Sequence, residues 1–290
     1  MVRDGYVNYM GDLYLIATPI GNLEDITLRA LRLLGEVPLI AAEDTRTIRK
    51  LLTRHEIAAP KLLSYTDRNR KARTAALLAA LEGGDIALVS EAGTPAISDP
   101  GVHLVQAALA AGHRVVPIPG PSAVIAALAA SGLPTRRFHY LGFLPRQPGQ
   151  RLRLLREAAT IPDTIVAFES PHRLRRTLVD LIEAFGDRQV AVWRELTKLH
   201  EELFRGTPTE ALDHFARPRG EFTLVIEGAG DTKPKPESRP DVGAQLRELK
   251  RRGVRARDAV RQVSASSSLP HRLVYSRWLA LADEDEPSVS

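Results

Sequence analysis

The first 130 residues alternate between short apolar runs and longer stretches whose apolar positions recur at helical spacing. The apolar runs lie at residues 13–17, 39–42, 86–89 and 114–118. The helical patterns between them are clearest at residues 27–34 and 70–81. Short apolar runs are typical of buried strands, and strands that alternate with helices of this length form βαβ units. The pattern therefore predicts an α/β fold with a mainly parallel sheet.

A second α/β region follows, and beyond it the pattern changes. Strand candidates lie at residues 164–168, 189–194 and 222–227. Residues 135–150, rich in Pro, Gly and Arg, are expected to be a connector. Short helical patterns at residues 246–249, 256–263 and 269–281 indicate a helix-turn-helix-like module. The predicted organisation is an N-terminal α/β domain at 12–135, a second α/β domain at 136–228, a linker at 229–240 and a basic helical module at 241–282.

Turn-forming residues follow each predicted strand of the first half. They read TPIGN at 18–22, EDT at 43–45, SEAGTPAISDPG at 90–101 and PIPGPS at 117–122. The carboxyl ends of parallel strands meet at one edge of a sheet, where open α/β folds bind ligands. Gly and Pro in such loops let main-chain groups approach a ligand closely. The four loops therefore predict one pocket, suited to a ligand recognised by shape and amide hydrogen bonds, such as S-adenosylmethionine.

Composition narrows the classes of function. The 290-residue chain is 44% hydrophobic and has no cysteine, so sizeable cores are expected and disulfides and thiolate metal sites are excluded. The eight histidines form no HExxH pair, so no metal site is expected. GxGxxG, GxxxxGK[ST] and GxSxG are absent, which disfavours dinucleotide, nucleoside-triphosphate and serine-hydrolase chemistry. Without an apolar run of about 18 residues or a signal-peptide pattern, we expect a cytoplasmic protein that does not enter a membrane.

Positive charge gathers in two segments of a chain whose net charge is +5. Residues 136–156 hold six arginines and no acid, interleaved with aromatic residues. Residues 241–282 hold nine Lys or Arg against three Asp or Glu. Such clusters are typical of nucleic-acid-binding proteins, although a solvated basic face has the same composition. The residues predicted to contact RNA are Arg146, Arg151, Arg153, Arg255 and Arg257. Phe143 is expected in the core, with stacking on a base as the alternative.

Seven motifs occur in order along the chain. They are TPIGNL at 18–23, AEDTR at 42–46, SEAGTPAISDPG at 90–101, PGPSA at 119–123, GFLPR at 142–146, ESPHR at 169–173 and RELTKLHEE at 194–202. Together they resemble the ribosomal small-subunit methyltransferase I family, the 16S rRNA (cytidine-2′-O)-methyltransferases of the tetrapyrrole-methylase superfamily. The resemblance extends over about residues 12–282. One departure is Glu91, where the family usually has Asp.

The resemblance implies a two-domain tetrapyrrole-methylase-like fold that binds S-adenosyl-L-methionine in the cleft between the domains. It also implies a homodimer and, as substrate, a cytidine ribose in the decoding region of 16S rRNA within the small ribosomal subunit. The residues expected to bind the cofactor are Pro19, Gly21, Glu91, Ala92, Gly93, Thr94, Ile97, Pro121, Ser122, Ala123, Phe168, Glu169 and Thr223.

Methyl transfer from a sulfonium is an in-line displacement, which depends on alignment and a dry pocket. A protonated ribose hydroxyl is a poor nucleophile, so a base or a stabilising charge is expected beside it. The carboxylates at predicted strand ends are Glu43, Asp44, Glu91, Asp99, Glu169 and Glu195, and Lys198 or an arginine is the alternative stabiliser. The sequence does not choose among them, and the catalytic candidates are Glu43, Asp44, Glu195 and Lys198.

Two other functions stay open at this point. One is methylation of a tetrapyrrole or another small molecule by the same fold, for which the basic segments have no use. The other is non-catalytic binding of nucleic acid, which predicts no cofactor binding.

Overall fold

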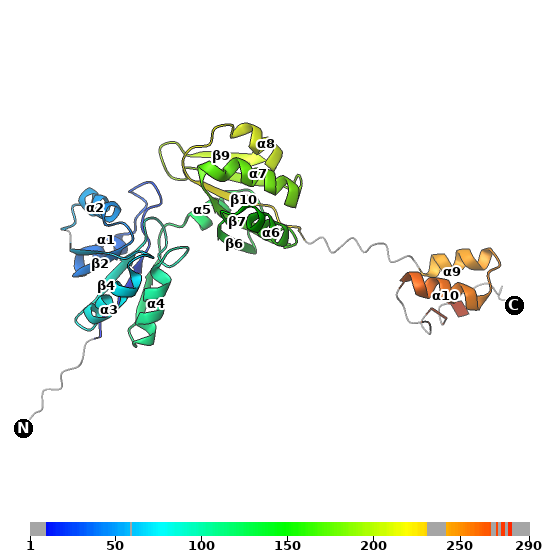
Figure 1. The fold of residues 1–290 in the computed structure, drawn as a ribbon, viewed down its shortest axis with the longest axis horizontal. Coiled ribbons are helices and arrows are strands. Elements are labelled where there is room, and N and C mark those ends of the chain that lie inside the picture. The colour runs from blue at the N-terminus through cyan, green and yellow to red at the C-terminus, as the bar shows by residue number, and fades with distance from the viewer. Residues whose placement is uncertain are drawn as a thin grey trace, which may run out of the picture. The chain divides into compact units, whose positions relative to one another are not determined.

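The computed structural model describes residues 10–58, 60–230 and 242–267, together with residues 271, 274, 275, 278 and 279. The chain divides into two compact units between Gly230 and Asp231 (Figure 1). The first unit contains two five-stranded sheets and their helices, and the second is helical. None of the helices in these ranges is long and apolar enough to cross a membrane.

The first sheet is parallel throughout. Its strands are β1 (Leu13–Ile16), β2 (Leu39–Ala42), β3 (Lys61–Ser64), β4 (Ile86–Val89) and β5 (Val115–Ile118), in the order β3-β2-β4-β1-β5. Side chains of β4 alternate between two covered faces, which is why the strand is apolar at every position. Ala87 and Val89 pack in one core, and Ile86 and Leu88 in the other. The mainly parallel sheet predicted from the apolar runs is confirmed.

Two pairs of helices cover the two faces of the first sheet. Helices α1 (Leu28–Glu36) and α2 (Thr45–Arg54) lie on one face, and α3 (Arg70–Leu81) and α4 (Gly101–Ala110) on the other. The Thr27 and Asp44 side chains cap α1 and α2 by accepting hydrogen bonds from the Ala30 and Arg46 amides. These caps set where the loops at the carboxyl edge of the sheet end.

The second sheet is mixed. Its strands are β6 (Phe138–Phe143), β7 (Thr164–Glu169), β8 (Val190–Arg194), β9 (Glu202–Gly206) and β10 (Phe222–Ile226), in the order β6-β7-β10-β8-β9. The β6–β7 pair is parallel and the other pairs are antiparallel. Helices α6 (Pro148–Ala158), α7 (Pro171–Phe185) and α8 (Pro208–His214) pack on one face.

Helix α5 (Ala123–Ala129) covers the opposite face of the second sheet (Figure 1). Its Val124, Ala127 and Leu128 share a core with β7, β8 and β10. Trp193 Nε1 also donates a hydrogen bond to the Ala127 carbonyl at 3.1 Å. Because α5 begins directly after the loop that follows β5, this packing fixes that loop of the first sheet against the second sheet.

The expected connector at residues 135–150 is wrong, because the chain forms β6 there and then begins α6. The aromatic residues of FHYLGF favour a strand, and Pro148 takes a first-turn position that suits proline. Strands β3 and β9 were also not predicted. All three strands lie at sheet edges, where half-exposed positions interrupt the apolar run that reveals a central strand.

The second unit holds α9 (Val242–Arg251) and α10 (Ala256–Ser267), joined by a turn at residues 252–255. Its core contains Leu246, Ala259, Val260, Val263 and Val274. Most of the third expected helix, at 269–281, and most of the expected linker lie outside the described residues. The expectation of an α/β fold with a small C-terminal helical module is confirmed.

Candidate functional site

Three loops meet at the carboxyl edge of the first sheet, after β1, β4 and β5. The Thr18 amide donates to the Gly93 carbonyl at 2.9 Å, and the Gly93 amide to the Thr18 carbonyl at 3.0 Å. The Thr94 hydroxyl donates to the Pro121 carbonyl at 3.3 Å. The loop after β4 is thus bonded to both of the other loops. We call this connected edge the main-chain rim, and open α/β sheets bind ligands at such an edge.

The loop after β4 has a strained backbone. Gly93 has a φ of 77°, and a Cβ at this position would lie 3.3 Å from Ile20 Cγ2. Ala96 and Ser98 are also left-handed, with φ of 67° and 61°, at a cost of about 1–3 kcal/mol each. The Asp99 carboxylate holds them by accepting hydrogen bonds from the Ala96 amide at 2.8 Å and the Gly101 amide at 2.6 Å. Strain maintained in this way is typical of ligand-binding loops.

Thr18 brings an unused polar group to the main-chain rim. It is 4% exposed, and its hydroxyl has no hydrogen-bond partner among the residues that the structure describes. Buried polar groups without a partner are rare, and a bound ligand is one way to satisfy them. Ile97, in the loop after β4, is by contrast 52% exposed. The rim therefore combines a buried hydroxyl that has no partner in the described ranges with an exposed apolar side chain, which fits a ligand with polar and apolar parts.

The second sheet contributes aromatic residues beside the loop after β4. The hydroxyls of Ser98 and Tyr140 are 2.8 Å apart, so β6 contacts this loop. Phe168 on β7 has its ring centroid 5.3 Å from both the Tyr140 and the Phe143 rings. Phe143 itself is 62% exposed, so the expectation of a core position for it is wrong. Its exposed ring is instead available for stacking.

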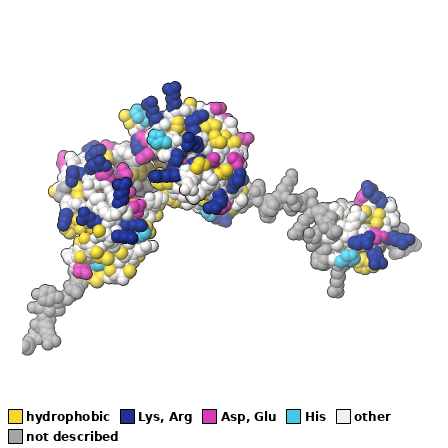
Figure 2. Space-filling view, viewed as in Figure 1, with side chains coloured by type: hydrophobic (Ala, Val, Ile, Leu, Met, Phe, Trp, Pro, Cys, Tyr) yellow, Lys and Arg dark blue, Asp and Glu magenta, His cyan; other side chains and the backbone are white. Residues whose placement is uncertain are grey.

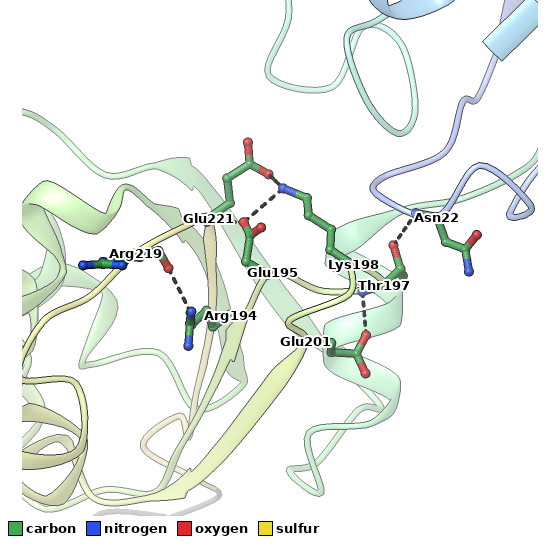
Figure 3. A network of polar contacts seen from close by, with 8 residues as sticks. All are labelled: Asn22, Arg194, Glu195, Thr197, Lys198, Glu201, Arg219 and Glu221. Atoms are coloured by element: carbon green, nitrogen blue, oxygen red, sulfur yellow. Dashed lines mark hydrogen bonds and ion pairs between the residues drawn. The ribbon is translucent and has the colours of Figure 1, made fainter. Parts of the chain in front are cut away.

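A polar network joins the loop after β8 to the loop after β1 (Figure 3). The Asn22 amide donates to Thr197 Oγ1 at 3.1 Å. Glu195 and Thr197 have positive φ values, 51° and 68°. A glycine is required at position 21, because a Cβ there would lie 2.5 Å from Lys198 Cγ. The network therefore holds two loops that are far apart in the sequence in close contact.

Lys198 is held between two carboxylates, with its Nζ 3.0 Å from Glu195 Oε1 and 2.9 Å from Glu221 Oε2 (Figure 3). Burial lowers the pKa of Lys198, but its two carboxylate partners outweigh burial and raise it above the usual value. Burial raises the pKa of Glu195, but hydrogen bonds from the Glu221 amide and from Lys198 leave it lowered. The charges of Lys198 and Glu195 are therefore engaged in ion pairs within the protein, and these pairs hold neighbouring loops together.

Glu43 and Asp44 follow β2, and their surroundings differ. Asp44 caps α2 and ion-pairs with Arg46 at 2.6 Å, and hydrogen bonds from Arg46 lower its pKa to about 2. Burial raises the pKa of Glu43, and the nearby carboxylates of Asp99 and Glu91 act in the same direction. The Glu91 amide donates to Glu43 at 3.4 Å and opposes this shift only in part. Glu43 is therefore the better proton acceptor near neutral pH.

Comparison with known proteins identifies the fold. The sequence profile of the Tetrapyrrole (Corrin/Porphyrin) Methylases matches residues 12–212. Uroporphyrin-III-C-methyltransferase from Thermus thermophilus superposes with a TM-score of 0.56 at 23% identity, over 75% of this chain and 94% of that one. A further structure of that enzyme, in complex with S-adenosylhomocysteine, has a TM-score of 0.54 at 21% identity, over 75% of this chain and 97% of that one.

Two relatives are much more similar in sequence. The ribosomal RNA small subunit methyltransferase I of Halalkalibacterium halodurans is 46% identical over 92% of this chain and 94% of its own length. The protein of the same name from Bacillus subtilis is 40% identical over 93% of this chain and 94% of its own length. The chain belongs to the ribosomal RNA small subunit methyltransferase I family. The resemblance inferred from the seven motifs is therefore confirmed.

Members of the ribosomal RNA small subunit methyltransferase I family differ in length. The Thermotoga maritima protein is 50% identical over 222 residues, which are 99% of its own length but 76% of this chain. A family member thus exists without an equivalent of about a quarter of this chain.

The structure brings most of the predicted cofactor residues together in the loops of the rim. These loops contain Pro19, Glu91, Ala92, Gly93, Thr94, Ile97, Pro121 and Ser122, and Ala123 begins α5. Gly21 lies at the contact with Lys198. Phe168 and Thr223 are paired neighbours on β7 and β10. Ligand binding by these residues stays a prediction.

Glu169 does not fit a ligand contact through its side chain. The carboxylate is fully buried and ion-pairs with Arg173 at 2.7 Å. It also accepts hydrogen bonds from the Ser170 amide and the Thr177 hydroxyl, each at 2.6 Å. These contacts use its oxygens to join β7 to α7, so we interpret Glu169 as a structural residue.

The five arginines predicted to contact RNA differ in exposure. The Arg151 side chain is 3% exposed and its Nε lies 2.6 Å from Asp180 Oδ2, so it faces α7 and is not available to a phosphate. Arg153 is exposed, with Glu157 at 4.0 Å. Arg146, Arg255 and Arg257 are exposed and have no carboxylate partner within the described ranges. The prediction that Arg151 contacts RNA is therefore wrong.

Thr18 and the Ser98–Tyr140 contact were not singled out in the sequence. Thr18 opens the TPIGN motif, so its position at a strand end was a usable signal. Ser98 and Tyr140 lie in different sheet lobes, and no sequence pattern joins them. Within the described ranges, no group of three or more His, Cys, Asp or Glu residues is placed to hold a metal ion.

Proposed function

We propose that the protein transfers a methyl group from S-adenosylmethionine to the 2′-hydroxyl of a cytidine ribose in the 16S rRNA of the small ribosomal subunit. The protein is a methyltransferase of a family whose members are named for small-subunit ribosomal RNA. The observation that carries the proposal is the main-chain rim with its unsatisfied Thr18 hydroxyl, in a chain of that family.

The rim fits S-adenosylmethionine because that molecule has an adenine, a sulfonium and an amino-acid end, and no phosphate. It needs amide partners and apolar contacts more than neutralising cations. The loops after β1, β4 and β5 are joined by their own hydrogen bonds, and the buried Thr18 hydroxyl has no partner among the described residues. Ile97 and Phe168 are the apolar side chains beside these loops. The S-adenosylhomocysteine complex of the Thermus enzyme, which has the same fold, supports this assignment.

When bound, S-adenosylmethionine supplies a methyl group that its sulfonium activates for displacement. The protein's own residues must hold the ribose in line with that group and accept the proton of the 2′-hydroxyl. Glu43 suits the second task, because its pKa is raised by burial and it lies against the Glu91 amide of the rim. Asp44, Glu195 and Lys198 suit it less, since each is held in an ion pair.

An RNA substrate is favoured over a tetrapyrrole. The relatives named for ribosomal RNA are 40% and 46% identical over more than nine-tenths of the chain, whereas the Thermus enzyme that acts on uroporphyrin is 23% identical. The proposed phosphate contacts are Arg146 and Arg153 in the first unit, and Arg255 and Arg257 in the second. A homodimer is part of the proposal, on the strength of the family resemblance.

Calorimetric titration with S-adenosylmethionine tests the cofactor site. Gly93→Val should abolish binding, because a β-branched side chain at a φ of 77° strains the rim and meets Ile20. Thr18→Val keeps the side-chain shape but removes the hydroxyl, so it should weaken binding about 3- to 10-fold. The same change should raise the thermal stability of the free protein, because a buried polar group without a partner is removed.

Thr160→Val is the matched control for Thr18→Val, because Thr160 is exposed and its hydroxyl donates to the Glu157 carbonyl at the end of α6. It should leave cofactor binding at the wild-type level. Wild-type affinity in Thr18→Val would remove that hydroxyl from the site, and wild-type affinity in Gly93→Val would show that the cofactor binds elsewhere.

A further inference from the structure

Helix α2 carries its basic residues on one exposed face. Four of its basic residues are exposed, and their spacing of three, one and four positions places them on one side of the helix: Arg46, Arg49, Lys50 and Arg54. The buried residues of the same helix are Ile48, Leu51 and Leu52. We call the exposed set, with Thr53, the α2 cationic face. Figure 2 shows Lys and Arg side chains, in dark blue, in the region where Figure 1 labels α2.

Half of the charge on the α2 cationic face is not neutralised within the protein. Arg46 pairs with Asp44 at 2.6 Å, and Arg54 approaches Glu24 at 3.5 Å. The Arg49 and Lys50 side chains have no carboxylate partner in the described part of the chain. Like charges at three- and four-residue spacing destabilise a helix, and here all four belong to one ten-residue element. A bound polyanion would offset that repulsion.

The side chains of the α2 cationic face border a shallow depression on the surface. The five residues that line it are Arg46, Arg49, Lys50, Thr53 and Arg54. Thr53 donates its hydroxyl to the Arg49 carbonyl, so the groups that remain directed at a ligand are cations. A cavity lined by four cations and no acid suits phosphate oxygens.

The position of α2 ties this face to the candidate active site. The helix starts two residues after Glu43, which the Glu91 amide of the rim contacts at 3.4 Å. At its other end, the His55 ring lies 3.0 Å from the Leu23 carbonyl, and Arg54 approaches Glu24. Leu23 and Glu24 belong to the loop after β1. Both ends of α2 therefore border loops of the rim, and its ten residues span about 15 Å, enough for several phosphates.

We propose that the α2 cationic face binds the phosphate backbone of the RNA strand on one side of the methylated nucleotide. Arg49 and Lys50 are the principal contacts, because their charge is not already neutralised. The face holds the strand at the loops after β1 and β4, so that the ribose reaches Glu43 and the rim. This inference rests on the proposed function, since it takes RNA as the substrate.

The test is the double substitution Arg49→Ala and Lys50→Ala in the full-length protein, with binding to small ribosomal subunits measured over a series of salt concentrations. Each lost phosphate contact lowers the slope of log affinity against log salt by about 0.7 for a single strand. The slope should therefore fall by about 1.4, and affinity near 0.1 M salt should fall about 10- to 30-fold. The KM for subunits should rise, whereas kcat and the affinity for S-adenosylmethionine should stay at their wild-type values.

A matched control removes the same charge from the opposite face of the sheet. Lys71 and Arg73 on α3 are exposed and, like Arg49 and Lys50, have no carboxylate partner within the described ranges. Replacing both with alanine should leave the slope and the affinity at wild-type values. An equal loss in this control would mean that net charge alone is measured, and it would overturn the proposal.

Three other outcomes decide the proposal. A wild-type slope in the Arg49→Ala, Lys50→Ala variant overturns it while the proposed function stands. A loss seen with intact subunits but not with protein-free 16S rRNA would assign the α2 cationic face to a ribosomal protein instead of RNA. If the wild-type protein binds S-adenosylmethionine but neither binds nor methylates subunits, the proposed function itself fails, and the RNA assignment of α2 fails with it.

Discussion

The carboxyl edge of the first sheet and the lobe built on the second sheet use charged residues in opposite ways. In the second-sheet lobe the charges pair with one another: Arg151 with Asp180, Arg194 with Glu202, and Lys198 with Glu195 and Glu221. At the carboxyl edge, Glu43 has a raised pKa and a single long amide contact. Nearby, Arg49 and Lys50 have no carboxylate partner within the described ranges.

A run of like charge in a sequence therefore does not by itself locate a binding surface. Residues 136–156 contain six arginines and no acid, but four of them pair with acids outside the segment: Arg137 with Asp163, Arg151 with Asp180, Arg153 with Glu157 and Arg156 with Glu183. Helix α2 has four basic residues, and two of them, a larger share, have no carboxylate partner in the described ranges. The second-sheet lobe thus uses most of the arginines at 136–156 in ion pairs and leaves Arg146 exposed, whereas Glu43, Arg49 and Lys50 at the carboxyl edge have no ion-pair partner in the described ranges.

The largest expected effect is on the carboxyl edge. Glu43→Gln should lower kcat/KM for methylation of small subunits about 100-fold or more, as expected for loss of a general base, with cofactor affinity unchanged. The wild-type rate should fall as pH decreases through the raised pKa of Glu43, above its ordinary 4.5, and this acid limb should vanish in the variant. Asp44→Asn is the control and should keep the limb, because the pKa of Asp44 is about 2.

Glu43→Gln should also change stability in the direction opposite to activity. An acid whose pKa is raised by folding contributes stability below its unfolded pKa and loses it as pH rises through the folded value. At neutral pH the ionised Glu43 is therefore unfavourable to the fold, and the glutamine variant should unfold at the same or a higher temperature. A retained acid limb in Glu43→Gln, or its loss in Asp44→Asn, would transfer the role of base to another residue.

The next effect separates structure from binding in the second-sheet lobe. Arg151→Ala leaves the Asp180 carboxylate without its buried partner, so the free energy of unfolding in denaturant should fall by about 3 kcal/mol. The salt dependence of subunit binding should stay at the wild-type slope. Arg153→Ala, on the exposed side of the same helix, should change stability by less than about 0.5 kcal/mol. A flattened slope with unchanged stability in Arg151→Ala would reverse our interpretation.

The second unit offers the same comparison between arginines of α9, α10 and the turn that joins them. Arg255→Ala with Arg257→Ala removes two exposed charges, so the salt slope should fall by up to about 1.4. The control, Arg251→Ala with Arg252→Ala, removes two arginines that both pair with Glu248, and its slope should change less. Because the candidate base Glu43 and the rim lie in the first unit, kcat should be unchanged in both. Equal slopes in the two variants would count against RNA contact by Arg255 and Arg257.

The smallest effect is that of Arg146. It is exposed without a carboxylate partner in the described ranges, whereas Arg156 pairs with Glu183. Arg146→Ala should lower the salt slope by about 0.7 and affinity near 0.1 M salt about 5-fold, with cofactor affinity unchanged. Arg156→Ala should leave the slope within error of wild type. If Arg146→Ala also does so, Arg146 contacts no phosphate.

The sequence predicted the parts of the fold that depend on local pattern. Central strands such as β4 are apolar at every position, so their apolar runs reveal them. Edge strands such as β6 and β9 mix polar and apolar residues, and their place depends on pairing with distant strands. The loops of the rim were predictable because Gly and Pro mark the ends of parallel strands.

The use of charge was not predictable from the sequence. Arg151 and Arg146 lie five residues apart in one basic segment, yet one is buried against Asp180 and the other is exposed. The sequence predicts Lys198 as a catalytic candidate, but it does not predict the hydrogen bond from Lys198 to Glu221, 23 residues away. These pairings are set by tertiary contacts between helices and loops that no spacing in the chain encodes.

The most direct test of the central claim is methyl transfer from labelled S-adenosylmethionine to purified small ribosomal subunits that lack the modification, followed by mapping of the label. Label is expected on the 2′-oxygen of a cytidine in 16S rRNA, absent with Gly93→Val and strongly reduced with Glu43→Gln. Label on a base atom, or transfer to a tetrapyrrole without transfer to RNA, would contradict it.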